Sequence, residues 1–565
     1  MKKLLNRQIA IVAVAVIATV AFFSFKSGDD RNFQIAKNLD IFNAIVKELD
    51  MFYVDTIDPN KTIREGIDNM LYTLDPYTEY FPEEDQSELE QMIKGSFGGM
   101  GSYIAYNTKL KRSMISEPFE GTPAAKAGLK AGDILMEIDG QDLAGKNNAE
   151  VSQMLRGQAG TSFKLKIERP NEKGGRTPME FTIVRESIQN PAIPYTAVLD
   201  NNVGYISLST FSGNPSKEFK KAFLDLKKQG ATSLVIDLRS NGGGLLDEAV
   251  EIANYFLPRG KVIVTTKGKI KQASNTYKTL REPLDLDIPI AVLVNSGTAS
   301  ASEILSGSLQ DLDRAVIVGN RTFGKGLVQQ PIDFSDGSAI RLTIARYYTP
   351  SGRCIQRPYE SGKDKNYELD IYNRYEHGEF FSRDSIKLNE NERYLTSLGR
   401  TVYGGGGIMP DVFVPQDTTG VTSYLSSVIN RGLTLQFTFQ YTDNNRKKLS
   451  QYETEEDLLN YLRHQGLVEQ FIRFADSKGV KRRNILIQKS YKRLEANIYG
   501  NIIYNMLGLE AYLKYFNKSD ATVQQGIELL EKGEAFPKAP AETEEEVTKD
   551  NKDGKKKRTA QAYGI

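Results

Sequence analysis

The stretch from residue 291 to residue 329 constrains the fold of this 565-residue chain more than any other. It opens with an apolar run, Ala291-Val-Leu-Val-Asn295, whose pattern predicts a buried strand. After a turn containing Gly297, apolar residues recur at helical spacing, at positions 304, 305, 309 and 312. A second apolar run, residues 315–319, follows that helix. Similar apolar runs predict further strands at 203–208, 233–238 and 262–266, and helical spacing recurs at 219–228 and 246–256. Strands that alternate with helices in this way predict parallel βαβ units.

Two residues in this stretch are candidates for chemistry. Ser300 falls at the strand-to-helix turn, where free backbone N–H groups favour a developing negative charge, so it could be a nucleophile beside an oxyanion hole. The base is less obvious, because the only two histidines, His377 and His464, lie in polar, charged segments without a motif. Lys325, between two glycines, is the better candidate if burial lowers its pKa towards neutral. The alternative is a helix-capping serine and a surface lysine, which are the commoner roles of such residues.

The surrounding residues resemble a known protease signature. Thr298-Ala-Ser-Ala-Ser-Glu-Ile304, Thr322-Phe-Gly-Lys-Gly326 and Gln329 match, in type and spacing, the pattern of the carboxyl-terminal processing proteases, also called tail-specific proteases. The resemblance implies that Ser300 is the nucleophile, Lys325 the general base and Gln329 the partner that orients the lysine amine. It gives Asp311 a structural or supporting role. By the same resemblance the body is a crotonase-like or ClpP-like α/β spiral that needs no metal or cofactor.

A glycine-rich loop, Asp237-Leu-Arg-Ser-Asn-Gly-Gly-Gly244, follows another apolar run. It lacks the lysine and hydroxyl pair that a phosphate-binding P-loop requires. In the resembled proteases a similar loop lies against the nucleophile. This implies that the amide of Gly243, or of Gly242 beside it, pairs with the amide of Ala301 to hold the oxyanion. The alternative is a plain tight turn.

Residues 95–187 resemble a PDZ domain, most clearly in the run from Gly121-Thr-Pro-Ala-Ala to Glu137-Ile-Asp-Gly140. The backbone N–H groups of Gly99, Met100 and Gly101 can bind a terminal carboxylate, and the strand that follows can pair with an incoming peptide. A helix over 147–155 would form the other wall, and Arg156 at its end could contact the protease body. The alternatives are a small barrel without a peptide and an arginine that is simply exposed.

The N-terminus indicates export. Basic residues precede an unbroken apolar run from Ile9 to Phe25, which is typical of a signal peptide or a signal anchor. No clean cleavage site follows, so we expect an anchor in the inner membrane with the body on the periplasmic side of the cell envelope. The formal net charge of +1 gives no electrostatic case for nucleic acid, and the single cysteine, Cys354, excludes an intramolecular disulfide. Cys354 is conceivable as a nucleophile, but no histidine is near it in the sequence, and a structural role is the alternative.

These patterns predict an α+β multidomain protein with helical N- and C-terminal regions. The predicted regions are a signal anchor or signal peptide at 1–28, a helical region at 31–94, the PDZ-like domain at 95–187, the protease core at 188–415 with an insert at 357–406, a helical domain at 416–536 and a disordered tail at 537–565. In the resembled family the N-terminal helices often help to dimerise, which adds a homodimer or higher oligomer to the expected assemblies.

We therefore expect a serine endopeptidase that recognises the C-terminal tails of envelope proteins through its PDZ-like domain and cleaves them by a Ser/Lys mechanism. Its expected partners are unfolded or tail-exposed protein substrates. One alternative is a catalytically silent PDZ adaptor that binds protein tails. Another is acyl-thioester chemistry on the α/β body, as in crotonases, which the export signal disfavours because such cofactors are cytoplasmic.

Overall fold

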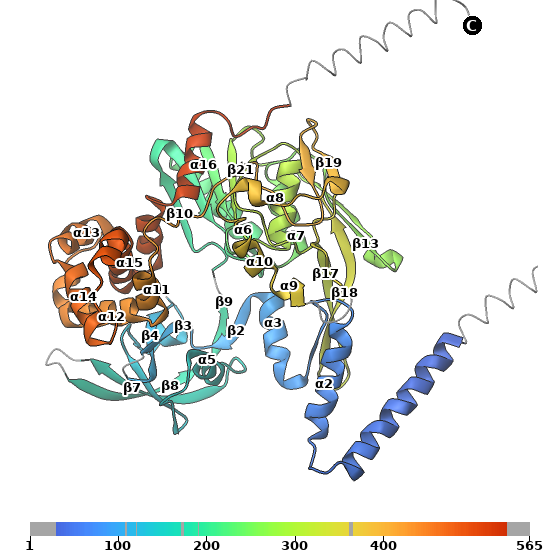
Figure 1. The fold of residues 1–565 in the computed structure, drawn as a ribbon, viewed down its shortest axis with the longest axis horizontal. Helices are drawn as coiled ribbons and strands as arrows, with labels where there is room; N and C mark the ends of the chain where they lie inside the picture. Colours follow the sequence, from blue (N-terminus) through green and yellow to red (C-terminus); the bar gives the residue numbers. More distant parts are fainter. Residues whose placement is uncertain are drawn as a thin grey trace, which may run out of the picture. The chain divides into compact units, whose positions relative to one another are not determined.

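The computed structural model describes residues 30–107, 110–119, 121–170, 175–189, 191–360 and 365–539. The chain is divided into two compact units, one before residue 81 and the other from Phe81 onward (Figure 1). The predicted membrane segment, residues 1–28, lies outside the described residues, and so does the predicted tail, 537–565, except for its first three residues. Within the described ranges, no helix combines the length and the apolar character that crossing a bilayer demands.

The first unit is helical. A helix over residues 30–52 precedes α2 (Pro59–Tyr72). α2 begins after Asp58, whose carboxylate accepts hydrogen bonds from the backbone N–H groups of Asn60 and Lys61. The large apolar side chains of the helix 30–52 are exposed, and among them are Phe33, Ile35, Leu39, Phe42, Ile45 and Leu49. Ile35, Leu39, Phe42, Ile45 and Leu49 recur at three- and four-residue steps, so they lie on one face of an amphipathic helix.

The PDZ-like module is an antiparallel sheet with two helices, α4 (Pro123–Lys126) and α5 (Asn148–Leu155). Its strands follow the order β3-β4-β5-β7-β8, with bounds Ser102–Asn107, Arg112–Pro118, Ile134–Ile138, Ser162–Pro170 and Arg176–Val184, and β6 (Gln141–Asp142) pairs with β5. Every second residue of β7 from Phe163 to Ile167 is buried, which is the two-residue period of a strand with one face on the core. β2 (Ser96–Gly99) pairs with β9 (Glu186–Gln189), so the segments that enter and leave the module lie side by side.

A six-stranded sheet forms the centre of the protease core (Figure 1). Its order is β10-β11-β12-β15-β16-β21, with bounds Tyr195–Leu199, Val203–Ser207, Ser233–Asp237, Ile290–Val294, Val316–Gly319 and Val412–Phe413. All neighbouring strands are parallel except β10 and β11. One face is covered by α6 (Pro215–Lys228), α7 (Leu246–Asn254) and α8 (Ala301–Asp311), and the other by α16 (Ala521–Glu531).

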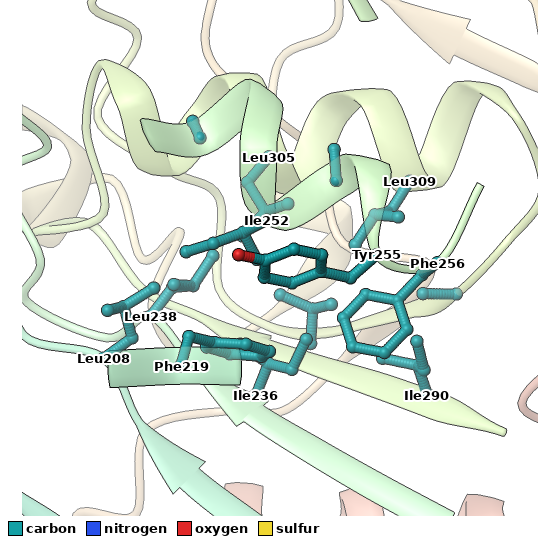
Figure 2. Close-up of a cluster of buried hydrophobic side chains, with 14 of the residues drawn as sticks. Leu208, Phe219, Ile236, Leu238, Ile252, Tyr255, Phe256, Ile290, Leu305 and Leu309 are labelled. Carbon is teal, nitrogen blue, oxygen red and sulfur yellow. The ribbon is translucent and has the colours of Figure 1, made fainter. Parts of the chain in front are cut away.

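The two faces of this sheet carry separate hydrophobic cores. On β12, Leu234 and Ile236 pack towards α6, α7 and α8, whereas Val235 packs towards α16, as the two-residue period of a strand requires. Figure 2 shows the first core, in which side chains from the helices meet strand residues such as Ile236 and Ile290. The buried hydroxyl of Tyr255 donates to the carbonyl of Ser216 at 3.0 Å, which satisfies its polar end.

One predicted strand lies outside that sheet. Residues 262–266 belong to β13 (Val262–Gly268), which is antiparallel to both β14 (Thr276–Lys278) and β18 (Ala339–Tyr348). β18 also pairs with β17 (Leu327–Asp333). The prediction of parallel βαβ units is therefore wrong for this strand. Its partners are the neighbouring β14 and a strand far downstream, and an apolar run alone does not distinguish them from a parallel neighbour.

The polar insert, residues 357–406, forms short elements on the protease core. They are α9 (Lys365–Glu368), α10 (Asp370–Glu376), β19 (Arg393–Leu395) and β20 (Thr401–Tyr403). Arg374 on α10 donates to the carbonyls of Thr322 (2.7 Å) and Phe323 (3.3 Å). The insert thus contacts the loop that carries Lys325, a role to which no sequence pattern pointed.

The C-terminal helices form a separate hydrophobic core, with one exception. The core is shared by α11 (Ser423–Asn430), α12 (Leu433–Leu449), α13 (Glu455–Arg463), α14 (Leu467–Ser477) and α15 (Asn484–Asn517). α16 instead packs its Val523, Ile527 and Leu530 on the protease sheet. α16 lies within the predicted helical domain, 416–536, and its helical period predicted an apolar face but not the surface that the face covers.

Candidate active site

Ser300 lies between β15 and α8, at the predicted strand-to-helix turn, and is the N-cap residue of α8. Its backbone angles, φ 58° and ψ −118°, are ones that residues with a side chain rarely adopt. Such strain persists only where neighbouring contacts over-determine the conformation, and it is frequent at active sites. Here the glycine-rich loop supplies contacts, since the carbonyl of Asn241 accepts from the N–H of Ala299 (3.0 Å) and from the hydroxyl of Ser302 (2.9 Å).

Gly243 touches the candidate nucleophile. A Cβ added at Gly243 would lie 2.8 Å from the Cβ of Ser300 and 2.9 Å from the backbone nitrogen of Ala301, so only glycine is compatible with this approach. Its φ of 100° also favours glycine. The N–H of Gly243, however, donates to Oδ1 of Asn241 at 2.9 Å. The implied oxyanion pair is therefore side by side, but one of its two donors has an internal partner.

Lys325 lies in the loop between β16 and β17, and its side chain is half-buried. The glycines on either side allow the loop to pack closely, because a Cβ at Gly326 would lie 2.7 Å from the backbone nitrogen of Gln356. Gln329 follows on β17, just after a shift in the register with β18. Its amide nitrogen donates to the hydroxyl of Thr343 at 3.2 Å.

Ser300, Lys325 and Gln329 all line one pocket of about 370 Å³. We call it the catalytic pocket. Its wall also includes the proposed oxyanion residues and the alternative to one of them, namely Gly243, Ala301 and Gly242. The pocket thus brings together three segments that lie far apart in the sequence.

Glu303 is a buried residue of this site that sequence reasoning missed. Its Oε1 accepts from the hydroxyl of Thr322 (2.5 Å) and the N–H of Gly324 (2.7 Å). Its Oε2 accepts from the backbone N–H groups of Lys325 (2.8 Å) and Ser300 (2.9 Å). Burial raises the pKa of Glu303 to about 7, although all four donors favour the ionised form. One carboxyl therefore joins the serine turn to the lysine loop.

Tyr347 joins the same two segments through their carbonyls. Its hydroxyl lies 3.2 Å from the carbonyl oxygen of Ser300 and within hydrogen-bond distance of that of Lys325. The side chain is buried and lines the catalytic pocket. Glu303 and Tyr347 together fix both backbone groups of Ser300 and both of Lys325.

The other candidates for nucleophile or base do not line this pocket. The rings of His377 and His464 are in exposed positions, each with Nδ1 against the carbonyl of its own helix, at Asn373 and Asn460. Burial raises the pKa of the Cys354 thiol, which opposes formation of a nucleophilic thiolate. Two basic side chains, Lys325 and Arg341, line the pocket with Ser300. Of these two residue types, lysine is the one that serves as a general base in enzymes.

Asp311 lies at the far end of α8 from Ser300. Its carboxylate forms an ion pair with Arg353 at 2.7 Å, and both side chains are fully buried. It also accepts from the backbone N–H of Ser351 at 3.0 Å. These contacts anchor the end of the helix, in keeping with the supporting role that the resemblance implied.

The PDZ groove is a second pocket, of about 400 Å³, lined by β3 and α5. Gly99, Met100 and Gly101 lie along its wall, where the sequence predicted a carboxylate-binding loop. Arg156 follows α5 and lines the same groove, with its guanidinium 4.9 Å from the ring centre of Phe97. The groove has the walls that were expected of a peptide-binding module.

Comparison with known proteins identifies the family. Residues 202–368 match peptidase family S41, and residues 114–169 match the PDZ domain. A carboxy-terminal-processing protease of Bartonella bacilliformis is 38% identical over 327 residues, which cover 57% of this chain and 73% of that protein. The chain belongs to the carboxy-terminal processing proteases.

Other members of this protease family are similar over the same region. A probable CtpA-like serine protease of Staphylococcus aureus is 36% identical over 351 residues, which are 61% of this chain and 68% of that protein. The solved structure of a photosystem II D1 C-terminal processing protease is 31% identical, covers 57% of this chain and 91% of its own, and has a TM-score of 0.33. Residues 424–508 match a family of unknown function.

Membership makes this protein a serine-type peptidase with carboxy-terminal processing activity. It also confirms the predicted combination of a PDZ domain with an α/β protease core.

Proposed function

We propose that this carboxy-terminal processing protease binds the C-terminal tail of an envelope protein in its PDZ groove and cleaves the polypeptide at Ser300 with Lys325 as general base. One observation carries the proposal. Ser300, Lys325 and Gln329 line one pocket, and Glu303 and Tyr347 hold the backbones of the first two. A serine on a strained turn beside a lysine is an arrangement that permits nucleophilic catalysis without histidine.

The mechanism begins with a neutral Lys325 amine, which removes the hydroxyl proton as Ser300 Oγ attacks the scissile carbonyl carbon. The N–H of Ala301, at the start of α8, stabilises the resulting oxyanion, and the N–H of Gly243 joins it by turning away from Asn241. The C–N bond then breaks while the lysine ammonium gives its proton to the leaving amine. Water, deprotonated by Lys325, hydrolyses the acyl-enzyme.

Gln329 orients the lysine in this scheme. Its amide nitrogen donates to Thr343, so the amide oxygen is the atom left to accept from the ammonium. Arg156 and Asp311 are supporting residues, the first beside the PDZ groove and the second at the end of α8.

Location and assembly form a second part of the proposal. The apolar run at residues 9–25 would anchor the protein in the inner membrane, with the protease on the periplasmic side. The exposed apolar side chains of residues 30–52 would pair with those of a second copy. Fractionation of the full-length chain tests the anchor, and light scattering of a chain that begins at residue 29 tests the dimer.

Substitution of the two central residues tests the chemistry. Ser300→Ala and Lys325→Ala should each lower cleavage of a tail-bearing unfolded protein by roughly 10⁴-fold or more, because each removes a group that no neighbour replaces. The initial rate of cleavage is measured by mass spectrometry, and circular dichroism checks the fold of each variant.

His377→Ala combined with His464→Ala is the matched control, since it removes both histidines and should leave the rate unchanged. The Ser/Lys assignment would be refuted if Lys325→Ala kept full activity, or if the double histidine variant lost its activity. A substrate whose C-terminal carboxylate is amidated should bind more weakly if the PDZ groove recognises the terminus.

A further inference from the structure

A third pocket lies between the PDZ groove and the catalytic pocket. It measures about 640 Å³, and we call it the bridging pocket, defined by Met92, Tyr103, Arg156, Ser212 and Leu509. Tyr103 and Arg156 also line the PDZ groove, and Met92 and Ser212 also line the catalytic pocket. The bridging pocket therefore shares one wall with the PDZ groove and another with the catalytic pocket that contains Ser300.

The two residues of the wall shared with the catalytic pocket, Met92 and Ser212, are joined by a hydrogen bond. The hydroxyl of Ser212 donates to the carbonyl of Met92 at 3.2 Å. The preceding residue, Phe211, donates its N–H to the carbonyl of Gly243 at 2.9 Å. A chain that passes Ser212 thus runs along the glycine-rich loop that touches Ser300.

Leu509 is a residue of α15 in the C-terminal helical domain and belongs neither to the PDZ module nor to the protease core. It follows Gly508, which interrupts α15 with a φ of 80° and a ψ of −173°, angles that glycine adopts without a steric penalty. α15 also packs against β4 of the PDZ module and β10 of the core. The helical domain, to which no sequence pattern assigned a role, therefore contributes one wall of the bridging pocket.

We propose that the bridging pocket holds the extended segment of the substrate between its PDZ-bound tail and its scissile bond, and that Leu509 is a specificity-determining contact for that segment. The proposal rests on the proposed function, since it needs one substrate chain to occupy both the PDZ groove and the catalytic pocket.

The lining indicates which substrate segments fit. Among the described residues of the bridging pocket, Arg156 carries the only charge, and the others are apolar or carry hydroxyls. An acidic or neutral segment is therefore favoured over a basic one, which would meet a like charge at the junction with the PDZ groove. The substrate class is an extended polypeptide without lysine or arginine in this stretch.

The test compares two substrates. One is a long peptide that ends in a recognised tail and spans both sites, and the other is a short chromogenic peptide that fills only the catalytic pocket. In Leu509→Trp the added ring narrows the bridging pocket, so kcat/KM should fall roughly tenfold more for the long substrate than for the short one. Ile485→Trp is the control, because Ile485 is on the same helix and 74% exposed, and both substrates should be cleaved as by the wild type.

Two further measurements guard against a misfolded variant. Leu509→Ala removes bulk without adding any, and should raise kcat/KM for a long substrate with tryptophan in the bridging segment. A long substrate with lysine in that segment should have a lower kcat/KM for the wild type than one with a neutral residue there. In Arg156→Glu the lysine substrate should instead have the higher kcat/KM. Equal effects of Leu509→Trp on both substrates, or no effect of charge in the segment, would overturn the proposal. Failure of the wild type to cleave even the short peptide would instead overturn the proposed function.

Discussion

Glu303 holds the two catalytic candidates from inside the protein. Its carboxyl accepts from the backbone N–H groups of Ser300 and Lys325, and Tyr347 contacts their carbonyls. A fully buried carboxyl is costly unless its oxygens are satisfied, and here each oxygen has two donors. The geometry of the serine and the lysine therefore depends on a residue that does not line the catalytic pocket.

The raised pKa of Glu303 predicts a pH dependence of stability. Between the ordinary value of 4.5 and about 7, the folded protein keeps a proton that the unfolded chain has already lost, so a rise in pH across this window favours unfolding. Glu303→Gln has no such proton. The stability of the wild type relative to this variant should therefore fall by up to roughly 3 kcal/mol between pH 5 and pH 8. Thermal unfolding of both proteins at several pH values measures the difference.

Tyr347→Phe is the matched control for this experiment. It removes a link between the same two segments without removing a carboxyl, so its stability difference from the wild type should not vary over this pH range. A constant difference for Glu303→Gln as well would show that the carboxyl does not titrate there.

At this scale the sequence predicted the serine and the lysine but not the residue that links them. Ser300 and Glu303 have the spacing of a capping box, S-x-x-E, which is the one local signal that could have pointed to Glu303. Its bonds to Gly324 and Lys325 join segments about twenty residues apart, and no local pattern encodes such tertiary contacts.

At the scale of elements, the insert is a support for the lysine loop. Arg374 on α10 donates to the carbonyls of Thr322 and Phe323, and the guanidinium of Arg357 lies 4.1 Å from the ring centre of Phe323. The N–H of Arg357 also donates to the carbonyl of Gly324 at 3.0 Å. These contacts cover the loop immediately before Lys325.

Loss of the Arg374 side chain should therefore impair catalysis more than binding. Arg374→Ala leaves two loop carbonyls without their donor, and the lysine should lose its position, lowering kcat roughly 10–100-fold with little change in KM. Steady-state kinetics on a short peptide measure both constants. Arg383→Ala, at an exposed position of the same insert, should behave like the wild type. Equal activity of the two variants would contradict a role for the insert.

The elements of the core show what periodicity can and cannot predict. The apolar runs of β11, β12, β15 and β16 and the helical spacing of α6, α7 and α8 predicted the parallel part of the core. β13 has a similar apolar run but pairs with β18 in another sheet. The two kinds of strand differ in the distant strand with which they form hydrogen bonds. The choice of that partner depends on the tertiary fold and not on the apolar run itself.

At the scale of the whole molecule, α16, the last helix of the described residues, is bound to the protease core. α16 buries its apolar face on the protease sheet, and Asp520 at its start forms two hydrogen bonds with Arg239 (2.9 and 2.8 Å). Arg239 also pairs with Asp237 at 2.6 Å, at the beginning of the glycine-rich loop that touches Ser300. Asp520, near the end of the described residues, is thus linked through Arg239 to the glycine-rich loop.

Asp520→Asn separates this ion pair from the helix cap. Asparagine still accepts from the N–H groups of Thr522 and Val523, as the aspartate does, but it cannot pair its charge with Arg239. We expect a loss of about 1–3 kcal/mol in stability, because the guanidinium is only 21% exposed and loses one of its two carboxylate partners. We also expect kcat to fall several-fold as the glycine-rich loop loosens. Chemical denaturation and peptide kinetics measure the two effects.

Asp520→Ala removes the cap as well, so it should cost about 1 kcal/mol more stability than Asp520→Asn while giving the same kcat. That pattern would separate the two tasks of the aspartate, because only the ion pair reaches the loop beside Ser300. If kcat instead fell in proportion to the stability lost, α16 would affect catalysis only by stabilising the protease sheet as a whole. Unchanged kcat in both variants would mean that the glycine-rich loop keeps its shape through Asp237 and Asn295 alone, whose side chains accept from the N–H groups of Arg239 and Ser240.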